Sequence, residues 1–525
     1  MATLRGNPAF LSSLARDVLA EAQEAQQKGR LGFLVGAGLS TAIGLPGWHA
    51  VNRALCEQRF ERDAPAGPKS AAGRGLAHAY LEQLQGQLLT AVDFVRQRAG
   101  ADFHVVVRSA LYERKELRSF QPTEVHHALC RLAVEAAPPY PCLHTTNWDE
   151  LLELALSTVA GRRATAVHLG RRALSDGPRV VHLHGYFPFH PPPQVHKARL
   201  ARDLVIGDLD YSRLSNDHGA WTNRELLSLI DSRSVLIVGM SMTDPNVRRL
   251  FAYLSDRRRD DGPQHFVVLL HRSADGDSPD ATEAARLLDE DEHQFWKARG
   301  VKILRLASWD RLNYLLRRIR FPDDKWDRRH RELRIAWARQ TYGGLPLDEP
   351  RVQALGTAAL AQARDACAQA ARLSGRVELN LFLPLTDGSY RRAFSSVKGR
   401  AVEAPRPFTP AHDRALIAEV ETALSLGQPI HRTEVKGGTA PPPGQPPFQS
   451  WYRSLISVPL FDDAAGGVPV AVIQLCSSDK DLTASLDPAR LAELRGFLRE
   501  AVRETCALLR TARLDRRPLR RTMEP

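Results

Sequence analysis

The sequence predicts an α/β domain with a doubly wound parallel sheet, followed by a smaller α+β domain. Three observations support this fold class. Short apolar runs alternate with helical patterns up to residue 320, which is typical of parallel strands connected by helices. A charged stretch, 321–350, interrupts the alternation. After it come a long helical pattern and several strand-like runs, two of which have the pattern of an antiparallel hairpin.

In the first domain, residues 1–320, the predicted elements follow the hydrophobic pattern in order. Helices are expected over residues 8–29, 49–60, 76–135 and 150–160. Strands are expected at the apolar runs 33–35, 141–145, 180–185, 235–239, 266–270 and 301–306, with 204–206 as a further candidate. The long helical stretch contains no strand pattern, so we predict a helical insertion over about 60–135.

The second domain, residues 351–515, follows a predicted linker helix at 321–350, whose apolar residues lie among many arginines. We expect this helix to have one apolar side that can pack against both domains. Beyond it, helices are expected over 351–373 and 488–513, and strands at 377–383, 454–460 and 468–475. Residues 436–449 are too rich in proline and glycine for regular structure, and 516–525 form a basic tail.

Composition narrows the class of protein. Of the 525 residues, 43% are apolar and 25% charged, as in soluble globular proteins, and no apolar run is long enough for a transmembrane helix. The net charge of +12 is spread along the chain, so we expect neither a nucleic-acid nor a membrane partner. The six cysteines are scattered without a CxxC pair, which predicts a reduced, cytoplasmic protein with no cysteine-based zinc site.

A glycine-rich turn follows the opening strand. Gly36-Ala37-Gly38 comes directly after an apolar run, and Ser40, Gly44, Pro46 and Trp48 follow it. A strand, a glycine turn and a helix can lay backbone N–H groups against a pyrophosphate. The turn alone fits a tight strand end equally well, and its spacing is not the GxGxxG dehydrogenase fingerprint.

Three more predicted strands end in polar groups, and ligands of open α/β sheets bind at the carboxyl ends of strands. These ends are Thr145-Thr146-Asn147-Trp148-Asp149, His184-Gly185, and Gly239-Met240-Ser241 with Asp244-Pro245-Asn246. Each has a structural alternative when taken singly: an Asx turn, a satisfied buried histidine, or a helix N-cap with proline in the first turn. All four ends occurring in this order favour a binding site.

Together the four ends resemble the sirtuin-like family, which binds NAD on a Rossmann-like fold. The first segment resembles GAGxSxxxGxPxW, the second TxNxD, the third the catalytic HG, and the last the GxSxxDPN motif of bacterial members. The resemblance covers about residues 8–320. Two departures matter: Gly47-Trp48-His49 replaces the Asp-Phe-Arg of protein deacylases, and the four zinc cysteines are missing. These departures resemble the prokaryotic branch that hydrolyses NAD in defence against phage.

The resemblance implies roles for the motif residues, with NAD as the substrate and no metal. Asn147 would orient water or the ribose, His184 would act as general base, and Asp149 would hold the nicotinamide carboxamide. Phosphates would lie against Gly36, Ala37, Gly38 and Ser40, with Gly44, Pro46, Trp48, Thr145 and Thr146 in the same site. Gly239, Ser241, Asp244 and Asn246 would line the adenosine side. Trp48 fits a core-packing role equally well.

In the second domain, the hairpin pattern Ser454–Leu475 and the upstream segment Ala423–Ile430 resemble the GAF family. The family's members bind small molecules such as nucleotides, or dimerise. The sequence leaves both possibilities open and predicts a homo-oligomer. The leading interpretation is therefore a regulated NAD⁺ hydrolase; the alternatives are an NAD-dependent protein deacylase and a non-catalytic regulator that binds NAD or ADP-ribose.

Overall fold

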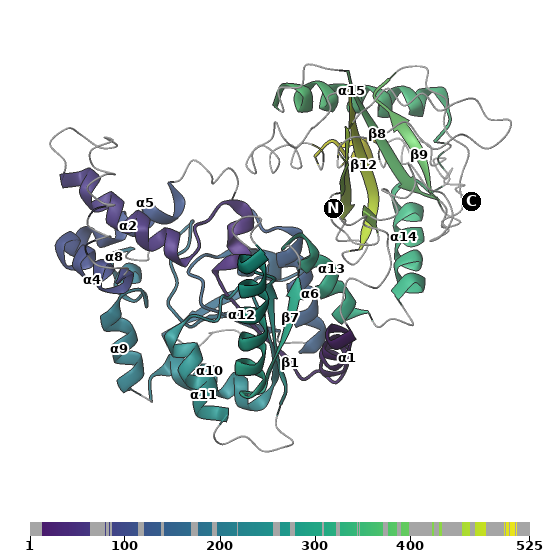
Figure 1. Cartoon of the computed structure of the whole chain (residues 1–525). Coiled ribbons are helices and arrows are strands. Elements are labelled where there is room, and N and C mark those ends of the chain that lie inside the picture. The colour runs from purple at the N-terminus through teal and green to yellow at the C-terminus, as the bar shows by residue number, and fades with distance from the viewer. Residues whose placement is uncertain are drawn as a thin grey trace, which may run out of the picture. The chain divides into compact units, whose positions relative to one another are not determined.

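The protein is seen here as a computed structural model. It describes residues 13–63, 87–113, 120–137, 141–169, 177–191, 197–217, 219–255, 263–272, 279–306, 309–321, 326–343, 347–370, 376–385, 390–397, 430–432, 454–461 and 468–478, with residues 79, 83, 345, 423, 424 and most of 498–511. The chain divides into two compact units (Figure 1). The N-terminal unit comprises Asn7–Leu312 and Leu316–Arg320, and the C-terminal unit comprises Phe321–Pro525 with Met1–Gly6 and Asn313–Leu315.

The N-terminal unit is built on a seven-stranded sheet in the order β3-β4-β2-β1-β5-β6-β7. All neighbouring strands are parallel, which confirms the predicted sheet. The strands are β1 Leu31–Val35, β2 Cys142–Thr145, β3 Thr165–His168, β4 Arg179–His182, β5 Ser234–Val238, β6 His265–Leu270 and β7 Val301–Leu306. Every residue of β1 is buried, as its continuous apolar run requires in a sheet covered on both faces.

The strand order places a topological switch at β1. The chain builds β2, β3 and β4 on one side of β1 and then crosses over to build β5, β6 and β7 on the other. The carboxyl ends of β4, β2, β1 and β5 therefore lie side by side at one edge of the sheet. These are the four strand ends at which the sequence places polar motifs.

Helices cover both faces of this sheet. On one face, α10 Trp221–Ser232, α11 Pro245–Ser255 and α12 Pro279–Lys297 bury a cluster that includes Phe251 and Trp296. On the other lie α1 Ser13–Gln27, α6 Glu124–Ala136 and α7 Leu151–Ala160. Thr123 is the N-cap of α6, and its backbone N–H donates to His126 Nδ1 at 3.1 Å. The short helices η4 Trp309–Arg311 and α13 Leu312–Arg320 follow β7.

The described part of the predicted insertion is helical. Within the predicted range of about 60–135 it contains the end of α2, Trp48–Asp63, then α4 Leu88–Ala99, η3 Gly100–Asp102, α5 Phe103–Tyr112 and α6. Residues of α2, α4 and α5 share a core with α8 Lys197–Arg202. Arg96 of α4 makes two hydrogen bonds, of 2.9 and 2.7 Å, to the Asp210 carboxylate on α9, Asp208–Asn216. The insertion thereby fixes α9, whose Tyr211 lies at the site described below.

One strand candidate in this unit was wrong, and one strand, β3, was not predicted. Residues 204–206 form no strand, although Leu204 and Ile206 are buried, because they pack among the helices of the insertion core. The edge strand β3 has only four residues, two of them half-buried, so its sequence lacked a long apolar run.

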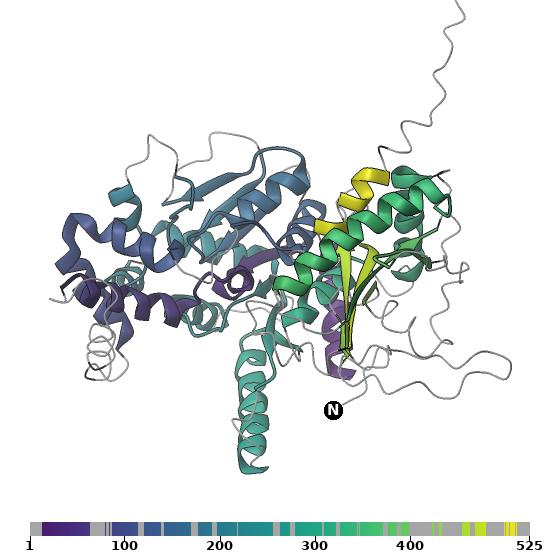
Figure 2. The same ribbon diagram turned by 90° about the horizontal axis from the view of Figure 1, so that it is seen from above.

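The C-terminal unit has an antiparallel five-stranded sheet in the order β10-β11-β12-β8-β9. Its strands are β8 Val377–Pro384, β9 Tyr390–Ser395, β10 Ile430–Arg432, β11 Ser454–Phe461 and β12 Pro469–Ser477. The predicted β11–β12 hairpin is confirmed, and β9 and β10 were not predicted. Figure 2 shows α15, Pro350–Ala370, running beside this sheet. Predicted loop 436–449 and tail 516–525 lie outside the described residues.

The helix expected in the charged segment is α14, Trp326–Tyr342. Its apolar residues Trp337 and Tyr342 are almost completely buried in the core of the C-terminal unit. The Arg334 side chain donates to the backbone carbonyls of Pro469 and Leu424, at 2.9 and 3.2 Å. The helix is thus part of the core of the C-terminal unit.

The opposite face of this sheet carries a buried polar row. Ser395, Asn380, Gln474 and Ser457 are direct cross-strand neighbours on β9, β8, β12 and β11, and all four are buried. Gln474 Nε2 donates to Ser457 Oγ at 3.1 Å, whereas Asn380 Oδ1 has no hydrogen-bond partner among the described residues. Among the described helices of the chain, none is both long and apolar enough to cross a lipid bilayer.

Candidate functional site

The glycines of the first motif bring the ends of β1 and β5 into direct contact. Gly36 N–H donates to Val238 O at 2.9 Å, and Gly38 N–H donates to Gly239 O at 2.7 Å. A Cβ on Gly36 or Gly38 would lie 2.6 or 2.8 Å from Gly239 O. These glycines therefore permit close backbone approach. Both N–H groups donate to backbone carbonyls here, and the position of these glycines against the phosphates stays a prediction.

The turn after β2 is tied to β1 through Thr145 and Thr146. Thr145 Oγ1 donates to Val35 O at 2.9 Å and accepts from Asn147 N–H at the same distance. The Thr146 N–H also donates to Val35 O, at 3.0 Å. Both threonines hold the turn that carries Asn147, so a hydroxyl-to-backbone network orients this part of the site.

Ser40, Asn147 and Asp149 form a buried hydrogen-bonded group that joins the first two motifs. Ser40 Oγ donates to Asp149 Oδ2 at 2.8 Å, and Asn147 Nδ2 donates to Ser40 Oγ at 3.0 Å. A serine hydroxyl has one hydrogen, and Ser40 donates it in the hydrogen bond to Asp149. In the contact with Asn147 the Ser40 oxygen can therefore only accept. This fixes the orientation of the Asn147 amide: its nitrogen lies toward Ser40 and its oxygen faces away.

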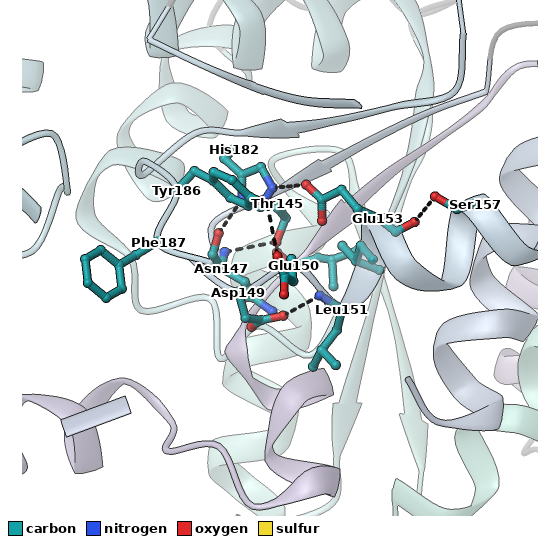
Figure 3. Close-up of polar contacts among 12 residues, drawn as sticks. Thr145, Asn147, Asp149, Glu150, Leu151, Glu153, Ser157, His182, Tyr186 and Phe187 are labelled. Atoms are coloured by element: carbon teal, nitrogen blue, oxygen red, sulfur yellow. Dashed lines mark hydrogen bonds and ion pairs between the residues drawn. The ribbon is translucent and has the colours of Figure 1, made fainter. Parts of the chain in front are cut away.

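Asp149 also accepts from the Leu151 N–H at 3.1 Å, at the start of α7 (Figure 3). Burial raises the pKa of Asp149, while the hydrogen bonds from Ser40 and Leu151 oppose this rise. The carboxylate is thus buried but supplied with donors.

His184 lies just past the end of β4, beside two residues of other elements. Its Nε2 is 3.6 Å from Asp244 Oδ2, and the Tyr211 hydroxyl donates to the same oxygen at 2.9 Å. Burial lowers the pKa of His184, and Asp244 only partly offsets the effect. The imidazole is therefore neutral near pH 7. Gly185, at φ 91°, allows the chain to turn here against Asp203 and Leu204.

Aromatic rings connect the two polar groups. Trp48 contacts Trp148 and Tyr211 edge-on, with ring centroids 5.9 and 6.2 Å apart, and Tyr211 contacts the His184 ring at 5.7 Å. Trp48 is only partly buried, whereas Trp148 is buried. Trp48 thus packs against Trp148, the residue after Asn147, and against Tyr211, which is hydrogen-bonded to Asp244.

The last motif has a structural role as well. Asp244 Oδ1 accepts from Val247 N–H at 2.8 Å, so Asp244 caps α11 with Pro245 in the first turn. Asn246 is buried and its Oδ1 accepts from Arg249 at 2.7 Å. The exposed Ser241 hydroxyl contacts Thr243. Of this motif, the structure brings Gly239 to the first motif and Asp244 to His184.

Gly44, at φ 92°, ends the short helix η2, Ala37–Ile43, and Pro46 follows just before α2.

Several buried polar atoms have no hydrogen-bond partner among the residues that the structure describes. They are Asn147 Oδ1, Trp148 Nε1, and both side-chain polar atoms of Asn52, which lies one turn after Trp48 on α2. Buried polar groups are normally hydrogen-bonded, so such atoms indicate a polar ligand or water. These atoms offer hydrogen-bond acceptors and donors, which match the carboxamide and hydroxyl groups of a polar ligand.

The sequence did not reveal four residues of this region: Asn52, Glu153, His182 and Tyr211. His182 and Glu153 form a buried pair with an Nε2–Oε1 distance of 2.6 Å. Their only sequence signal was position: His182 precedes His184 by two residues, and Glu153 follows Asp149 by four. Tyr211 and Asn52 lie on helices without any motif.

Comparison with protein-family models gives a match over part of the chain. Residues 141–304 match the model described as SIR2-like domain. The matched range includes three of the four strand ends, and the first motif precedes it. No curated protein matches the chain. Among solved structures, the chain is similar to a Sir2 homologue in complex with NAD, at 15% identity and a TM-score of 0.30, covering 60% of this chain and 98% of that one. A likeness this weak does not bear on function.

Proposed function

We propose that the N-terminal unit hydrolyses NAD⁺ to nicotinamide and ADP-ribose. The observation that carries this proposal is the Ser40–Asn147–Asp149 group. It leaves the Asn147 amide oxygen as a buried acceptor without a partner in the described part of the chain, at the carboxyl ends of the strands beside the switch point. The SIR2-like match over residues 141–304 supports NAD as the ligand.

The chemistry suits these residue types. Cleavage of a glycosidic bond has an oxocarbenium-like transition state, and the nicotinamide leaving group is already cationic, so it needs no general acid. The enzyme must position the ribose and activate a water molecule or a ribose hydroxyl. Asn147 Oδ1 would accept the hydrogen of that hydroxyl or water, and Asp149 would contact the nicotinamide carboxamide. Ala37 and Ser40, with Gly36 and Gly38 giving close approach, would lie along the phosphates.

His184 would act as the general base. The nearby Asp244 carboxylate favours the tautomer with hydrogen on Nε2, which leaves the lone pair on Nδ1. In this proposal Asp244 orients the base. The motif resemblance also places Asp244 on the adenosine side of the ligand, together with Gly239, Ser241 and Asn246.

The role of His184 predicts the pH profile of NAD cleavage. A base must be deprotonated, so the rate should fall as pH falls through the pKa of His184, which burial places below its usual 6.5. Asp244→Asn keeps an N-capping side chain but removes the charge that raises this pKa. We therefore expect its acidic limb to move to lower pH in kcat/KM profiles. An acidic limb centred above 6.5, or one that does not move in Asp244→Asn, would contradict the assignment.

Two other functions share the same fold: NAD-dependent deacylation, and NAD or ADP-ribose binding without turnover. One assay separates them. The full chain is incubated with NAD alone and with NAD plus an acetyl-lysine peptide, and free nicotinamide is measured. Release without peptide supports hydrolysis, release only with peptide supports deacylation, and ligand binding without release supports a regulator.

We propose that the C-terminal unit is a GAF-like regulatory module, in an oligomeric cytoplasmic effector that depletes NAD during phage defence. A constitutive NAD hydrolase would deplete its host, so such an effector requires restraint. The buried polar row over β9, β8, β12 and β11, with its unpaired Asn380 oxygen, supports a small polar ligand of the nucleotide type on that face. A trigger acts only if it binds the active state more tightly than the inactive one.

Removal of the C-terminal unit should change both the rate of NAD cleavage and the assembly state. The cut belongs after Arg320, because α14 is part of the C-terminal core. We expect residues 1–320 to differ from the full chain in nicotinamide release and in mass by light scattering. A matched fragment ending at residue 344 keeps α14, exposes Trp337 and Tyr342, and should aggregate. If residues 1–320 behave as the full chain does in both measurements, the regulatory role is wrong.

A further inference from the structure

His182 is the last residue of β4, and its side chain is fully buried with both ring nitrogens engaged (Figure 3). Nδ1 lies 2.8 Å from the backbone carbonyl oxygen of Asn147, and Nε2 lies 2.6 Å from Glu153 Oε1 on α7. The ring therefore connects the turn that carries Asn147 to the first helical turn after it.

The partners decide where the protons are. A carbonyl oxygen can only accept, so Nδ1 of His182 must carry a hydrogen. One further proton is shared between Nε2 and Glu153, either on the imidazole or on the carboxyl. In both arrangements the two hydrogen bonds persist. His182 thus has no free lone pair with which to act as a base on a substrate, unlike His184.

With the His182 contact, every polar atom of Asn147 but one has a partner. Its N–H donates to Thr145 Oγ1 at 2.9 Å, its carbonyl accepts from His182, and its Nδ2 donates to Ser40 at 3.0 Å. Within the described part of the chain, Oδ1 is the polar atom of Asn147 without a partner. A displacement of the Asn147 backbone would therefore move the one atom that is left to meet a ligand.

We propose that His182 and Glu153 are a positioning pair that holds the Asn147 backbone, so that the Asn147 amide oxygen meets the substrate in a fixed orientation. The proposal rests on the NAD cleavage proposed above. Neither residue contacts the substrate in it. His182 acts through the Asn147 carbonyl, and Glu153 acts by fixing the imidazole ring.

The surroundings of the pair are consistent with a shared proton. Titratable groups around the His182 ring are Glu153 from α7, Asp149 from the preceding turn, Tyr186, whose ring centroid is 4.6 Å away, and His168 on the neighbouring strand β3. Glu150 lies one step further away, where it accepts from the Tyr186 hydroxyl at 3.5 Å. Burial works to lower the pKa of His182, but Glu153, the Asn147 carbonyl and Asp149 more than offset it, so this pKa is raised.

The test compares His182→Ala, Glu153→Ala and Glu153→Gln in the full chain. A glutamine amide can donate to Nε2 of a neutral His182 and keep both bonds of the ring. We expect kcat for nicotinamide release to fall about 100-fold in both alanine variants and to recover mostly in Glu153→Gln, while the NAD dissociation constant stays within about threefold. The control is His144→Ala, a buried strand histidine near Glu225 on the other face of the sheet, which should keep its rate.

A second readout does not depend on activity. With selective ¹⁵N-asparagine labelling, the Asn147 side-chain amide signals should shift and exchange faster with solvent in His182→Ala, and stay unchanged in His144→Ala. If the parent cleaves no NAD, the proposed function fails. The Asn147 amide signals then still test whether His182 and Glu153 position Asn147. Unchanged Asn147 signals in His182→Ala, or a loss in NAD affinity as large as the loss in kcat, would overturn the proposal.

Discussion

Asn147→Ala is expected to reduce NAD cleavage by about 10²- to 10⁴-fold, the range typical when a positioned catalytic group is lost. The reason is the geometry of the Asn147 amide, whose nitrogen is used by Ser40 and whose oxygen is the free buried acceptor. Alanine removes that acceptor without disturbing the backbone bonds to Thr145 and His182. The measurement is single-turnover release of nicotinamide.

Asn147→Asp provides a matched comparison, because it keeps the size of the side chain and an oxygen at the same place. A carboxylate cannot donate to Ser40, and it would stand close to the Asp149 carboxylate, so we expect it to be nearly as inactive as alanine. Thermal unfolding of Asn147→Ala should remain close to that of the parent, whereas the two neighbouring buried carboxylates should lower the melting temperature of Asn147→Asp. Near-parental turnover in Asn147→Ala would remove Asn147 from the catalytic group.

Gly239→Ala is expected to destabilise the N-terminal unit by about 2–5 kcal/mol, through backbone strain and steric overlap together. Gly239 has φ 71°, and a Cβ there would lie 2.6 Å from Leu39 N and 2.9 Å from Gly36 O. Both neighbours are backbone atoms of the first motif, so the contact between β1 and β5 would have to open. Urea unfolding followed by tryptophan fluorescence measures the effect.

Gly161→Ala separates the two causes. Gly161 has a similar φ of 65° at the end of α7, but a Cβ there meets nothing within 4 Å. Alanine at this position should lower the free energy of unfolding by about 1 kcal/mol, which is the cost of the left-handed conformation alone. Equal losses in the two variants would show that the close approach of Gly239 to the first motif is not important for stability.

Much of the N-terminal fold could be predicted, because its central strands are continuous apolar runs followed by polar turns. The prediction failed where burial and secondary structure separate. Leu204 and Ile206 are buried in helical surroundings without forming a strand, whereas β3 pairs at the sheet edge with half-buried residues. In the C-terminal unit, β9 was missed; it includes two arginines.

The candidate site could be predicted in part for a physical reason. Parallel neighbouring strands end at one edge, so polar groups after β1, β2, β4 and β5 meet there once the strand order is known. The sequence could not show that the N–H groups of Gly36 and Gly38 donate to the carbonyls of Val238 and Gly239, because this depends on how closely β5 approaches β1. The His182–Glu153 pair depends on the register that places Thr145 opposite His182 and on the packing of α7.

The central claim is that this site cleaves NAD by itself. The most direct measurement is the product balance when the full chain is incubated with NAD alone, with nicotinamide and ADP-ribose followed by proton NMR. We expect both products to appear in equal amounts, and to form at least about 100-fold more slowly with Asn147→Ala. Bound NAD that remains intact under every condition in which the parent is folded, or products that form equally with Asn147→Ala, would contradict the account.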